Sequence, residues 1–322
     1  MRAVVLPRYG GPERLALAEV ETPRPAPGEV LIRVEAVGVS AGDVLVMRGE
    51  PHLVRLAFGL RRPRQPVIGR DVAGEVAAVG EGVTGFAVGD AVFAESEQGG
   101  WAEYAVVPEQ YVAARPRSID AVHAATVPVS AVTALQGLRL AGLDAGQHVL
   151  VNGASGGVGG FVVQLAKAMG AEVTGVCRGW KADHVRALGA DHVIDHTRDD
   201  FTAHEGRYDV VFDLVADHPL GRTRRALKRG GTLVLSSGRG GRNLGPMGRI
   251  AAASVVSPFV PQRLRPLAAK RDGDDLAELA RRIDAGEVRP VVDEVFPLER
   301  AADAARRFEA GDVRGKLVLA VR

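Results

Sequence analysis

The pattern of apolar and polar residues changes its character near Ser118. Before that point, short segments alternate apolar and polar residues between glycines and prolines, which is typical of half-buried strands. We expect strands over residues 1–7, 30–37, 71–79, 90–93 and 102–107. Several short strands at this spacing predict a small β-barrel or sandwich.

From Gln147 onward, near-continuous apolar strands alternate with helices. We expect strands over residues 148–151, 172–177, 192–195, 208–214 and 231–235, and helices over 161–169, 182–188 and 220–227. This alternation predicts a parallel sheet with helices on both faces. Two alanine-rich stretches before it, 119–127 and 132–140, are also predicted helices.

The residues after Asp272 resemble the first part of the chain in their pattern of apolar and polar residues. We expect a helix over residues 275–285, a strand over 291–296, a helix over 301–309 and a closing strand over 315–321. The closing strand resembles the opening strands more than the middle ones. We therefore predict two domains: a β-rich domain over 1–120 to which 287–322 returns, and an α/β domain over 121–286.

A glycine-rich turn, Asn152–Gly160, joins the strand over 148–151 to an apolar helix. A dinucleotide site requires this context, because the pyrophosphate lies at the start of the helix. Gly156 would let the backbone approach the pyrophosphate, and Gly159 would let the helix pack closely on the sheet. The first glycine of the usual fingerprint is replaced by Ala154. We expect the cofactor to contact Ala154, Ser155, Gly156, Gly157 and Val158, the alternative being a glycine-rich loop without a ligand.

The residues after the second strand indicate which nicotinamide cofactor is bound. An NAD site places an Asp or Glu about 20 residues past the turn. Here Cys177 is followed by Arg178 and Lys181, and the first acidic residue is Asp183. Because cations favour a 2′-phosphate, the sequence predicts NADPH rather than NADH. The alternative is that both cations are solvated residues at a helix start.

Several segments together resemble the zinc-independent medium-chain dehydrogenase/reductase superfamily, in its quinone oxidoreductase-like branch. These segments are residues 27–34, 69–76, 127–136, 152–159, 188–195 and 314–319. The resemblance implies an α/β protein with a GroES-like β-barrel catalytic domain, a Rossmann domain with a doubly wound parallel sheet, and an active-site cleft between them. It also implies a homodimer.

The resemblance assigns cofactor contacts. Lys181 and His196 stand where related reductases contact the 2′-phosphate, with His196 in place of the usual tyrosine. Lys316 matches the lysine of the family's closing Gly-Lys motif, with a solvated lysine as the alternative. The carboxyl ends of the last strands should border the nicotinamide. These ends are Val215, Ser236, Ser237 and Gly238.

It also assigns candidate catalytic residues. Ser40 stands where relatives carry an asparagine that orients the substrate, and Asp43 is expected to hold the same loop. Thr133 resembles the threonine that lies beside the nicotinamide. Each has a structural alternative: Ser40 as a loop cap, Asp43 as a turn former, and Thr133 as a helix residue bonding its own backbone.

The positions that hold zinc in metal-dependent relatives carry Ser40, Arg70-Asp71 and Val129, and a single cysteine, Cys177, excludes a four-thiolate site. We therefore expect no metal. Without a Lewis acid, hydride transfer to a quinone or an α,β-unsaturated carbonyl compound is the easier chemistry. The alternatives are a reductase of enoyl thioesters or polyketide intermediates, with Arg61–Arg64 on a phosphate, and a nicotinamide-binding sensor or RNA-binding protein.

The overall charge and hydropathy limit the classes of partner that we expect the protein to bind. A net charge of +2 argues against nucleic acid. No apolar run approaches the ~20 residues of a membrane span, and residues 1–7 do not have a signal-peptide layout. We expect a cytoplasmic enzyme with a small hydrophobic substrate. Two apolar stretches, 51–60 and 244–259, are interpreted as a lid over that substrate or, for the second, as a core helix or subunit interface.

Overall fold

The computed structural model describes residues 1–236 and 243–321. The chain forms two compact units, Met1–Val132 with Arg271–Arg322, and Thr133–Lys270. The sequence placed the boundaries after residues 120 and 286. In the division by contacts, the first unit also includes α3 (Ala121–Ala124), which packs on β3 (Glu29–Val39) and β4 (Asp71–Val79), and α9 (Gly273–Asp284), which packs on β7 (Val112–Ala114).

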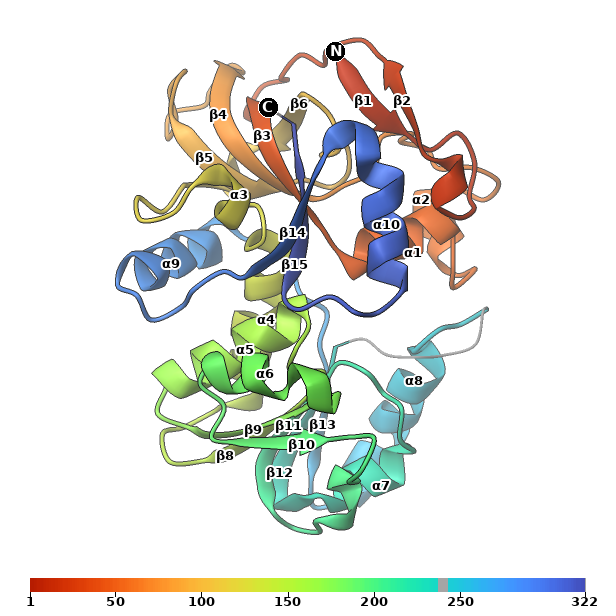
Figure 1. Cartoon of the computed structure of the whole chain (residues 1–322), viewed down its shortest axis with the longest axis vertical. Coiled ribbons are helices and arrows are strands. Elements are labelled where there is room, and N and C mark those ends of the chain that lie inside the picture. Colours follow the sequence, from red (N-terminus) through yellow and green to blue (C-terminus); the bar gives the residue numbers. More distant parts are fainter. Residues whose placement is uncertain (237–242, 322) are drawn as a thin grey trace. The chain divides into compact units, whose positions relative to one another are not determined.

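The first unit contains a seven-stranded sheet that is mostly antiparallel (Figure 1). Its strand order is β14 (Val292–Pro297), β15 (Lys316–Ala320), β3 (Glu29–Val39), β4 (Asp71–Val79), β5 (Ala91–Glu95) and β7 (Val112–Ala114), while β6 (Tyr104–Pro108) also pairs with β3. Only β14 and β15 pair in parallel. Because β15 pairs with β3, the tail completes the sheet that the first residues begin.

Shorter elements surround this sheet. They are β1 (Arg2–Val5) and β2 (Ala16–Glu19), which form a two-stranded sheet, the helices α1 (Ala41–Arg48), α2 (Val54–Phe58) and α10 (Ala301–Glu309), and the 3-10 turns Pro12–Arg14, Glu109–Tyr111 and Leu298–Arg300. The core is made of aliphatic side chains from β3, β4 and β15 together with Met47 and Trp101, all buried. The inward residues of β3, such as Ile32 and Val34, supply the alternation seen in the sequence.

The second unit is a six-stranded parallel sheet with a doubly wound order, as predicted. The order is β10 (His192–Asp195), β9 (Glu172–Cys177), β8 (His148–Asn152), β11 (Tyr208–Asp213), β12 (Leu227–Leu235) and β13 (Arg263–Pro266). The direction of winding reverses between β8 and β11. Ligands of such sheets bind outside the carboxyl ends of the strands at this reversal.

Helices connect and cover the strands of this sheet. They are α4 (Pro128–Ala141), which begins in the first unit, α5 (Gly157–Ala168), α6 (Ala182–Ala187), α7 (Leu220–Arg225) and α8 (Met247–Val256), with 3-10 turns at Gly179–Lys181, Phe201–Ala203 and Ser257–Phe259. α5 and α6 pack on β8, β9 and β10, whereas α7 and α8 pack on β12 and β13. Buried side chains such as Leu150, Val211 and Leu233 form the core.

Some predicted elements differ from those observed. The predicted helix over 119–127 was wrong beyond the four residues of α3, because Pro128 starts a separate helix. The predicted helix over 161–169 begins at Gly157, directly after the glycine turn. The segment 244–259 contains α8, on which Val255 is exposed, and the following 3-10 turn, on which Phe259 is exposed. Among the described residues, no helix is long and apolar enough to cross a membrane.

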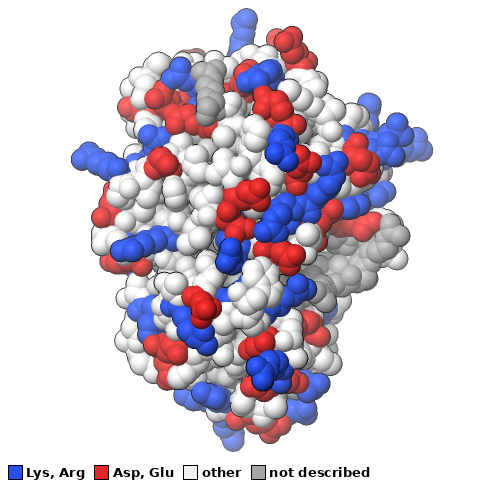
Figure 2. All heavy atoms as spheres, in the orientation of Figure 1, with Lys and Arg blue, Asp and Glu red and all other residues white. Residues whose placement is uncertain are grey.

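The surface carries both signs of charge. On the face drawn in Figure 2, Lys and Arg side chains are interspersed with Asp and Glu side chains. This distribution agrees with the small net charge of +2.

Candidate active site and cofactor site

A capped helix start fixes the first candidate residues. Ser40 has extended dihedral angles at the N-cap of α1, and the Asp43 carboxylate accepts the Ser40 backbone N–H at 2.8 Å through Oδ2. Gly49 ends the helix with a φ of 60°. The sequence analysis expected a loop here, but Ser40 is the N-cap of a helix and Asp43 lies in its first turn. The signals in the sequence are the Ser-x-x-Asp spacing at the start of the helix and Gly49 at its end.

The Ser40 side chain belongs to a buried polar cluster with Asp71 and Lys316. Lys316 Nζ donates to Ser40 Oγ at 2.7 Å and to Asp71 Oδ2 at 2.8 Å, and the Ser40 hydroxyl also donates to Asp71 Oδ2. Val129 N–H donates to the other Asp71 oxygen at 2.5 Å. Ser40, Asp71 and Lys316 are 4%, 0% and 4% exposed. Lys316 is thus not a solvated lysine, and each oxygen of Asp71 is bonded.

Strand register brings these three side chains together. β3 ends at Val39, directly before Ser40, and it pairs with Asp71 at the start of β4 and with the start of β15, where Lys316 lies. Gly38 makes room for the cluster: a Cβ there would lie 2.2 Å from the Ala125 carbonyl oxygen. Three segments distant in sequence therefore meet through β3.

Asp43 is a buried acid beside this cluster. Burial, with a smaller contribution from Asp71, raises the pKa of Asp43 to about 7. Its Oδ1 has no hydrogen-bond partner among the described residues. Nearby, Arg70 forms an ion pair with the mostly buried Glu95. Ionisation of Asp43 is therefore disfavoured below about pH 7.

The donor set does not fit a zinc ion. The positions at which the family resemblance predicts zinc ligands hold the Ser40 hydroxyl, the Arg70 guanidinium and the apolar Val129, while the Asp71 carboxylate is bonded by the Lys316 ammonium. Within the described residues, no group of three or more His, Cys, Asp or Glu side chains could hold a metal. An ammonium supplies the positive charge at this place in the first unit.

The glycine turn of the second unit fits a pyrophosphate. Gly153 has a φ of 96°, and α5 begins immediately after Gly156, so the unpaired N–H groups of its first turn lie at the turn. A Cβ on Gly159 would lie 2.1 Å from the Gly153 carbonyl oxygen, so only glycine allows this close approach. Ala154 is buried, donates its N–H to the Val176 carbonyl at 3.1 Å, and lies against Gly175.

The neighbouring strands bring the predicted phosphate-binding residues to one edge. Cys177 on β9 pairs with Asp195 on β10, so Arg178 and His196 follow paired residues. Both are exposed, whereas Lys181 is buried with Nζ 4.8 Å from the Trp180 ring centroid. The Asp195 carboxylate lies close to Gly179 at the same edge.

The single cysteine is a structural residue. Burial raises the pKa of the Cys177 thiol to about 11, so the thiolate is scarce at neutral pH. Its side chain lies at the end of β9, directly before Arg178.

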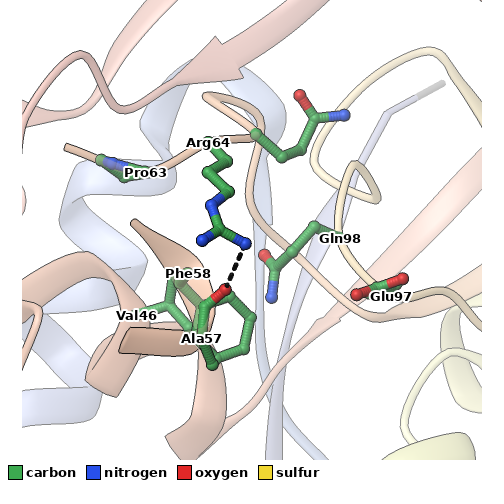
Figure 3. Close-up of a pocket in the computed structure, with 8 residues that line it drawn as sticks. Val46, Ala57, Phe58, Pro63, Arg64, Glu97 and Gln98 are labelled. Atoms are coloured by element: carbon green, nitrogen blue, oxygen red, sulfur yellow. Dashed lines mark hydrogen bonds between the residues drawn. The ribbon is translucent and has the colours of Figure 1, made fainter. Parts of the chain in front are cut away.

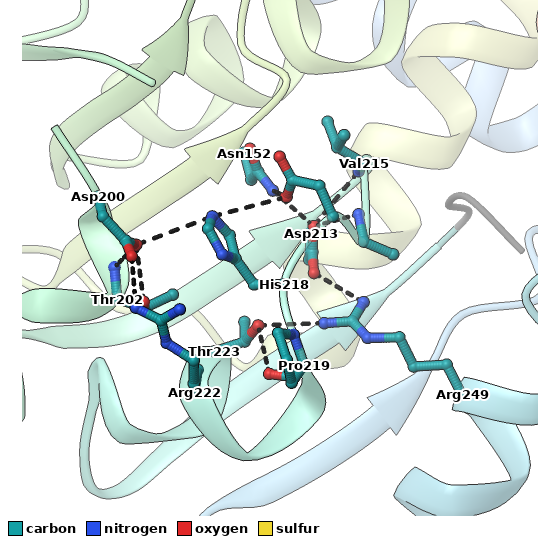
Figure 4. Close-up of polar contacts among 12 residues, drawn as sticks. Asn152, Asp200, Thr202, Asp213, Val215, His218, Pro219, Arg222, Thr223 and Arg249 are labelled. Carbon is teal, nitrogen blue, oxygen red and sulfur yellow. Dashed lines mark hydrogen bonds and ion pairs between the residues drawn. The ribbon is translucent and has the colours of Figure 1, made fainter. Parts of the chain in front are cut away.

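A polar cluster at the end of β11, absent from the sequence predictions, shapes the reversal point (Figure 4). Asn152 Nδ2 donates to Asp213 Oδ1 at 2.9 Å and to Asp217 at 3.0 Å. Asp213 also accepts the Ala216 N–H at 2.9 Å, and Arg249 Nη1 lies 2.7 Å from its other oxygen. Ala216 has a φ of 56°, a conformation that favours glycine. The signal in the sequence was an aspartate, Asp213, at the end of an apolar strand.

This cluster also positions Val215. The Val215 N–H donates to Asp213 Oδ1 at 3.3 Å, and a Cβ on Gly153 would lie 3.0 Å from Val215 Cγ2. Val215 is therefore beside the glycine turn, between the ends of β8 and β11.

The remaining predicted residues have the following places. Ser155 is buried, while Gly156, Gly157 and Val158 are half-buried at the start of α5. Thr133 is half-buried on α4, and Ser236 is half-buried after β12. Ser237 and Gly238 lie outside the described residues.

Comparison with known proteins agrees with this arrangement. Residues 26–117 match a family described as alcohol dehydrogenase GroES-like domain, and residues 188–319 match one described as zinc-binding dehydrogenase. The chain is 32% identical to a chloroplast envelope quinone oxidoreductase homolog of Arabidopsis thaliana over 323 residues, covering 96% of this chain and 95% of the relative.

A second relative and a solved structure extend the likeness. An NADPH-dependent alkenal/one oxidoreductase of Arabidopsis thaliana is 32% identical over 333 residues, covering 99% of this chain and 79% of the relative. The structure of the quinone oxidoreductase from Coxiella burnetii superposes with a TM-score of 0.88 at 26% identity, covering 100% of this chain and 99% of that one.

Replacing Asp43 with asparagine should stabilise the protein in alkaline solution. The folded protein holds the Asp43 proton to about pH 7, whereas an unfolded chain releases it near pH 4, so stability falls as pH rises between these values. Asp43→Asn should gain about 4 kcal/mol at pH 8, from about three pKa units at about 1.4 kcal/mol each, and little at pH 4, by urea unfolding. Asp120→Asn, at the exposed N-cap of α3, is the control. An equal gain at both pH values would contradict the assignment.

Removing the Lys316 cation should destabilise the first unit. Lys316→Met leaves Asp71 buried without its cation, which typically costs about 3–5 kcal/mol. Lys228→Met, which breaks the half-exposed pair with Asp209, should cost less than about 1 kcal/mol. Chemical denaturation of both variants measures the difference, and similar losses would show that the buried pair is unimportant.

Proposed function

The chain belongs to the medium-chain dehydrogenase/reductase superfamily, and from this premise we propose that it is a zinc-independent, NADPH-dependent reductase of quinones and α,β-unsaturated carbonyl compounds. The observation that carries the proposal is the Lys316 ammonium, bonded to the Ser40 hydroxyl where metal-dependent relatives place zinc ligands. A cation and a hydroxyl donor are present there, but a metal-binding set is not.

This arrangement suits conjugate reduction. When bound, the reduced nicotinamide supplies the hydride, and negative charge then develops on the carbonyl oxygen of the acceptor. Lys316 makes the Ser40 hydroxyl a stronger donor, because its ammonium bonds the same oxygen. Ser40 can release Asp71 and donate to the substrate oxygen, since Lys316 and Val129 continue to bond Asp71. Such a preorganised donor typically lowers a barrier by about 3 kcal/mol.

Asp43 has a positioning role in this proposal. Its carboxyl group bonds the Ser40 backbone and so fixes the start of α1. Below about pH 7, Asp43 is mostly protonated and adds little negative charge that would oppose charge development near Ser40. Thr133 is proposed to lie beside the nicotinamide, as the family resemblance implies.

The cofactor is held by the second unit. The start of α5 provides backbone N–H groups for the pyrophosphate, and Val215 and Ser236 border the nicotinamide at the ends of β11 and β12. Arg178, Lys181 and His196 favour a 2′-phosphate, which supports NADPH, although Asp195 shares their edge. The printed name of one relative includes NADPH dependence.

Two further parts of the proposal come from the sequence. The homodimer and the cytoplasmic location stay predictions. The substrate class is supported by the names of relatives, which include quinone and alkenal/one oxidoreductases.

The proposed activity is tested by following NADPH absorbance with a panel of quinones, enals and enones, with and without a chelator. We expect turnover that the chelator leaves unchanged. Ser40→Ala should lower kcat by about 100-fold through loss of the donor while NADPH still binds. Tight NADPH binding without turnover of any acceptor would refute a reductase.

The preference for NADPH over NADH is tested by replacing Arg178, the exposed arginine that follows β9. Arg178→Ser should weaken NADPH binding about tenfold, the loss of one charge-assisted contact, and leave NADH binding unchanged, as measured by fluorescence titration. Arg198→Ser, an exposed arginine beyond the β10 edge, is the control. Equal losses for both cofactors would refute the phosphate assignment.

A further inference from the structure

The first unit contains a cavity of about 250 Å³ beside α1 and α2 (Figure 3). Val46 of α1, Phe58 of α2 and Pro63 give it apolar walls. Ala57 and Arg64 also line it and are exposed, so the cavity is open to solvent. Sites for small molecules usually combine apolar walls with a few polar groups, and this volume suits a ligand with a single ring.

The Arg64 side chain is the polar group that a ligand can reach. Figure 3 shows it directed toward Ala57 and Phe58. Among the described residues it makes one hydrogen bond, from Nη1 to the Ala57 carbonyl oxygen at 3.4 Å, and no ion pair. A hydrogen bond of this length is weak, so Nε and Nη2 keep their donors for a ligand. The amide of Gln98, on another wall, is covered from solvent and takes no part.

The backbone that carries Arg64 is held in place by the turn before it. The Arg64 N–H donates to the Phe58 carbonyl oxygen at 2.7 Å, and the Tyr9 hydroxyl donates to the Gly59 carbonyl oxygen at 2.6 Å. Gly59 has a φ of 124°, and a Cβ there would lie 2.2 Å from the Arg62 carbonyl oxygen. Because this turn is closely packed, Arg64 lies at the cavity before a ligand arrives, which lowers the entropic cost of binding.

The charges around Arg64 favour an anion. Arg61 and Arg62 are exposed in the same loop, and neither forms an ion pair with a described residue. Glu97, the acidic residue that lines the cavity, is 82% exposed in its side chain and lies 3.9 Å from Arg271 Nη2. The loop therefore carries three guanidinium groups, whereas the carboxylate on the cavity wall already has a cation beside it. A guanidinium in this setting recognises a carboxylate through two parallel hydrogen bonds.

We propose that this cavity binds small carboxylates that carry an apolar ring, such as aromatic acids. The ring lies against Val46, Phe58 and Pro63, and the carboxylate accepts two hydrogen bonds from the Arg64 guanidinium. No residue of the buried Ser40 cluster lines the cavity. The site is therefore additional to the proposed catalytic one, and binding requires neither cofactor nor turnover.

Binding is tested with benzoate, benzamide and acetate, each titrated against the full-length protein by ligand-observed NMR without cofactor. Benzoate and benzamide share a ring but differ in charge. We expect benzoate to bind at least about tenfold more tightly, because only the carboxylate forms charge-assisted hydrogen bonds with Arg64. Acetate has the carboxylate but no ring, so it buries less apolar surface and should bind at least about tenfold more weakly than benzoate.

Two matched variants separate a specific contact from general attraction to a basic loop. Arg64→Gln should remove the preference for benzoate over benzamide. It should melt at the wild-type temperature, because Arg64 is exposed and has no ion pair among the described residues. Arg62→Gln removes the same charge from the same loop, but Arg62 does not line the cavity, so this variant should keep the preference. Equal losses in the two variants would overturn the assignment of Arg64.

The place of binding is measured with protein labelled at its valine methyl groups. Benzoate should shift the Val46 signals, which are identified by their loss in Val46→Ile, in the wild type and not in Arg64→Gln. Benzoate that binds no more tightly than benzamide or acetate, or that leaves the Val46 signals unmoved, contradicts the proposal. None of these measurements involves reduction of an acceptor, so this site and the proposed function can fail independently.

Discussion

The buried bonds of Lys316 to Asp71 and Ser40 are the constraint on which the first unit depends. They join β15, β4 and the end of β3, whose residues are separated by 245 and 276 positions from Lys316. Two charges removed from water stabilise a fold only when their geometry and remaining hydrogen bonds are complete. Here Val129 and the Ser40 hydroxyl complete them. The same bonds orient the hydroxyl that the proposed chemistry uses.

The raised pKa of Asp43 follows from this arrangement. A third charged carboxylate beside Asp71 would leave the cluster with excess negative charge, and burial alone already disfavours it. Below about pH 7, Asp43 therefore contributes its hydrogen bond to Ser40 with little added charge. The positive charges near Asp43 are those of Lys316 and Arg70.

In the second unit, a close backbone contact between Gly159 and Gly153 has a similar structural role. The approach of Gly159 to the Gly153 carbonyl draws α5 onto the sheet at the point where the strand order reverses. Asp213 then holds both Asn152 and the strained Ala216 at the neighbouring strand end. The first N–H groups of α5 and the ordered loop after β11 therefore lie at the same edge of the sheet.

Much of this could be predicted from the sequence, because apolar runs such as Val149–Val151 and Val210–Phe212 have a periodicity that depends only on local burial. β13 was missed because the edge segment Arg263–Pro266 is polar. The identity of Lys316 was visible, but its pairing with Asp71 depends on strand register, and so on contacts that no local pattern contains.

The return of β15 to β3 also sets an order of events during synthesis. Residues 133–270 form one continuous unit, whereas the first unit needs residues from both ends of the chain. A domain can fold on the ribosome only when all of its residues have emerged. The second unit can therefore fold while Asp71 still lacks its cation, and the first unit is complete only after β15 has left the exit tunnel.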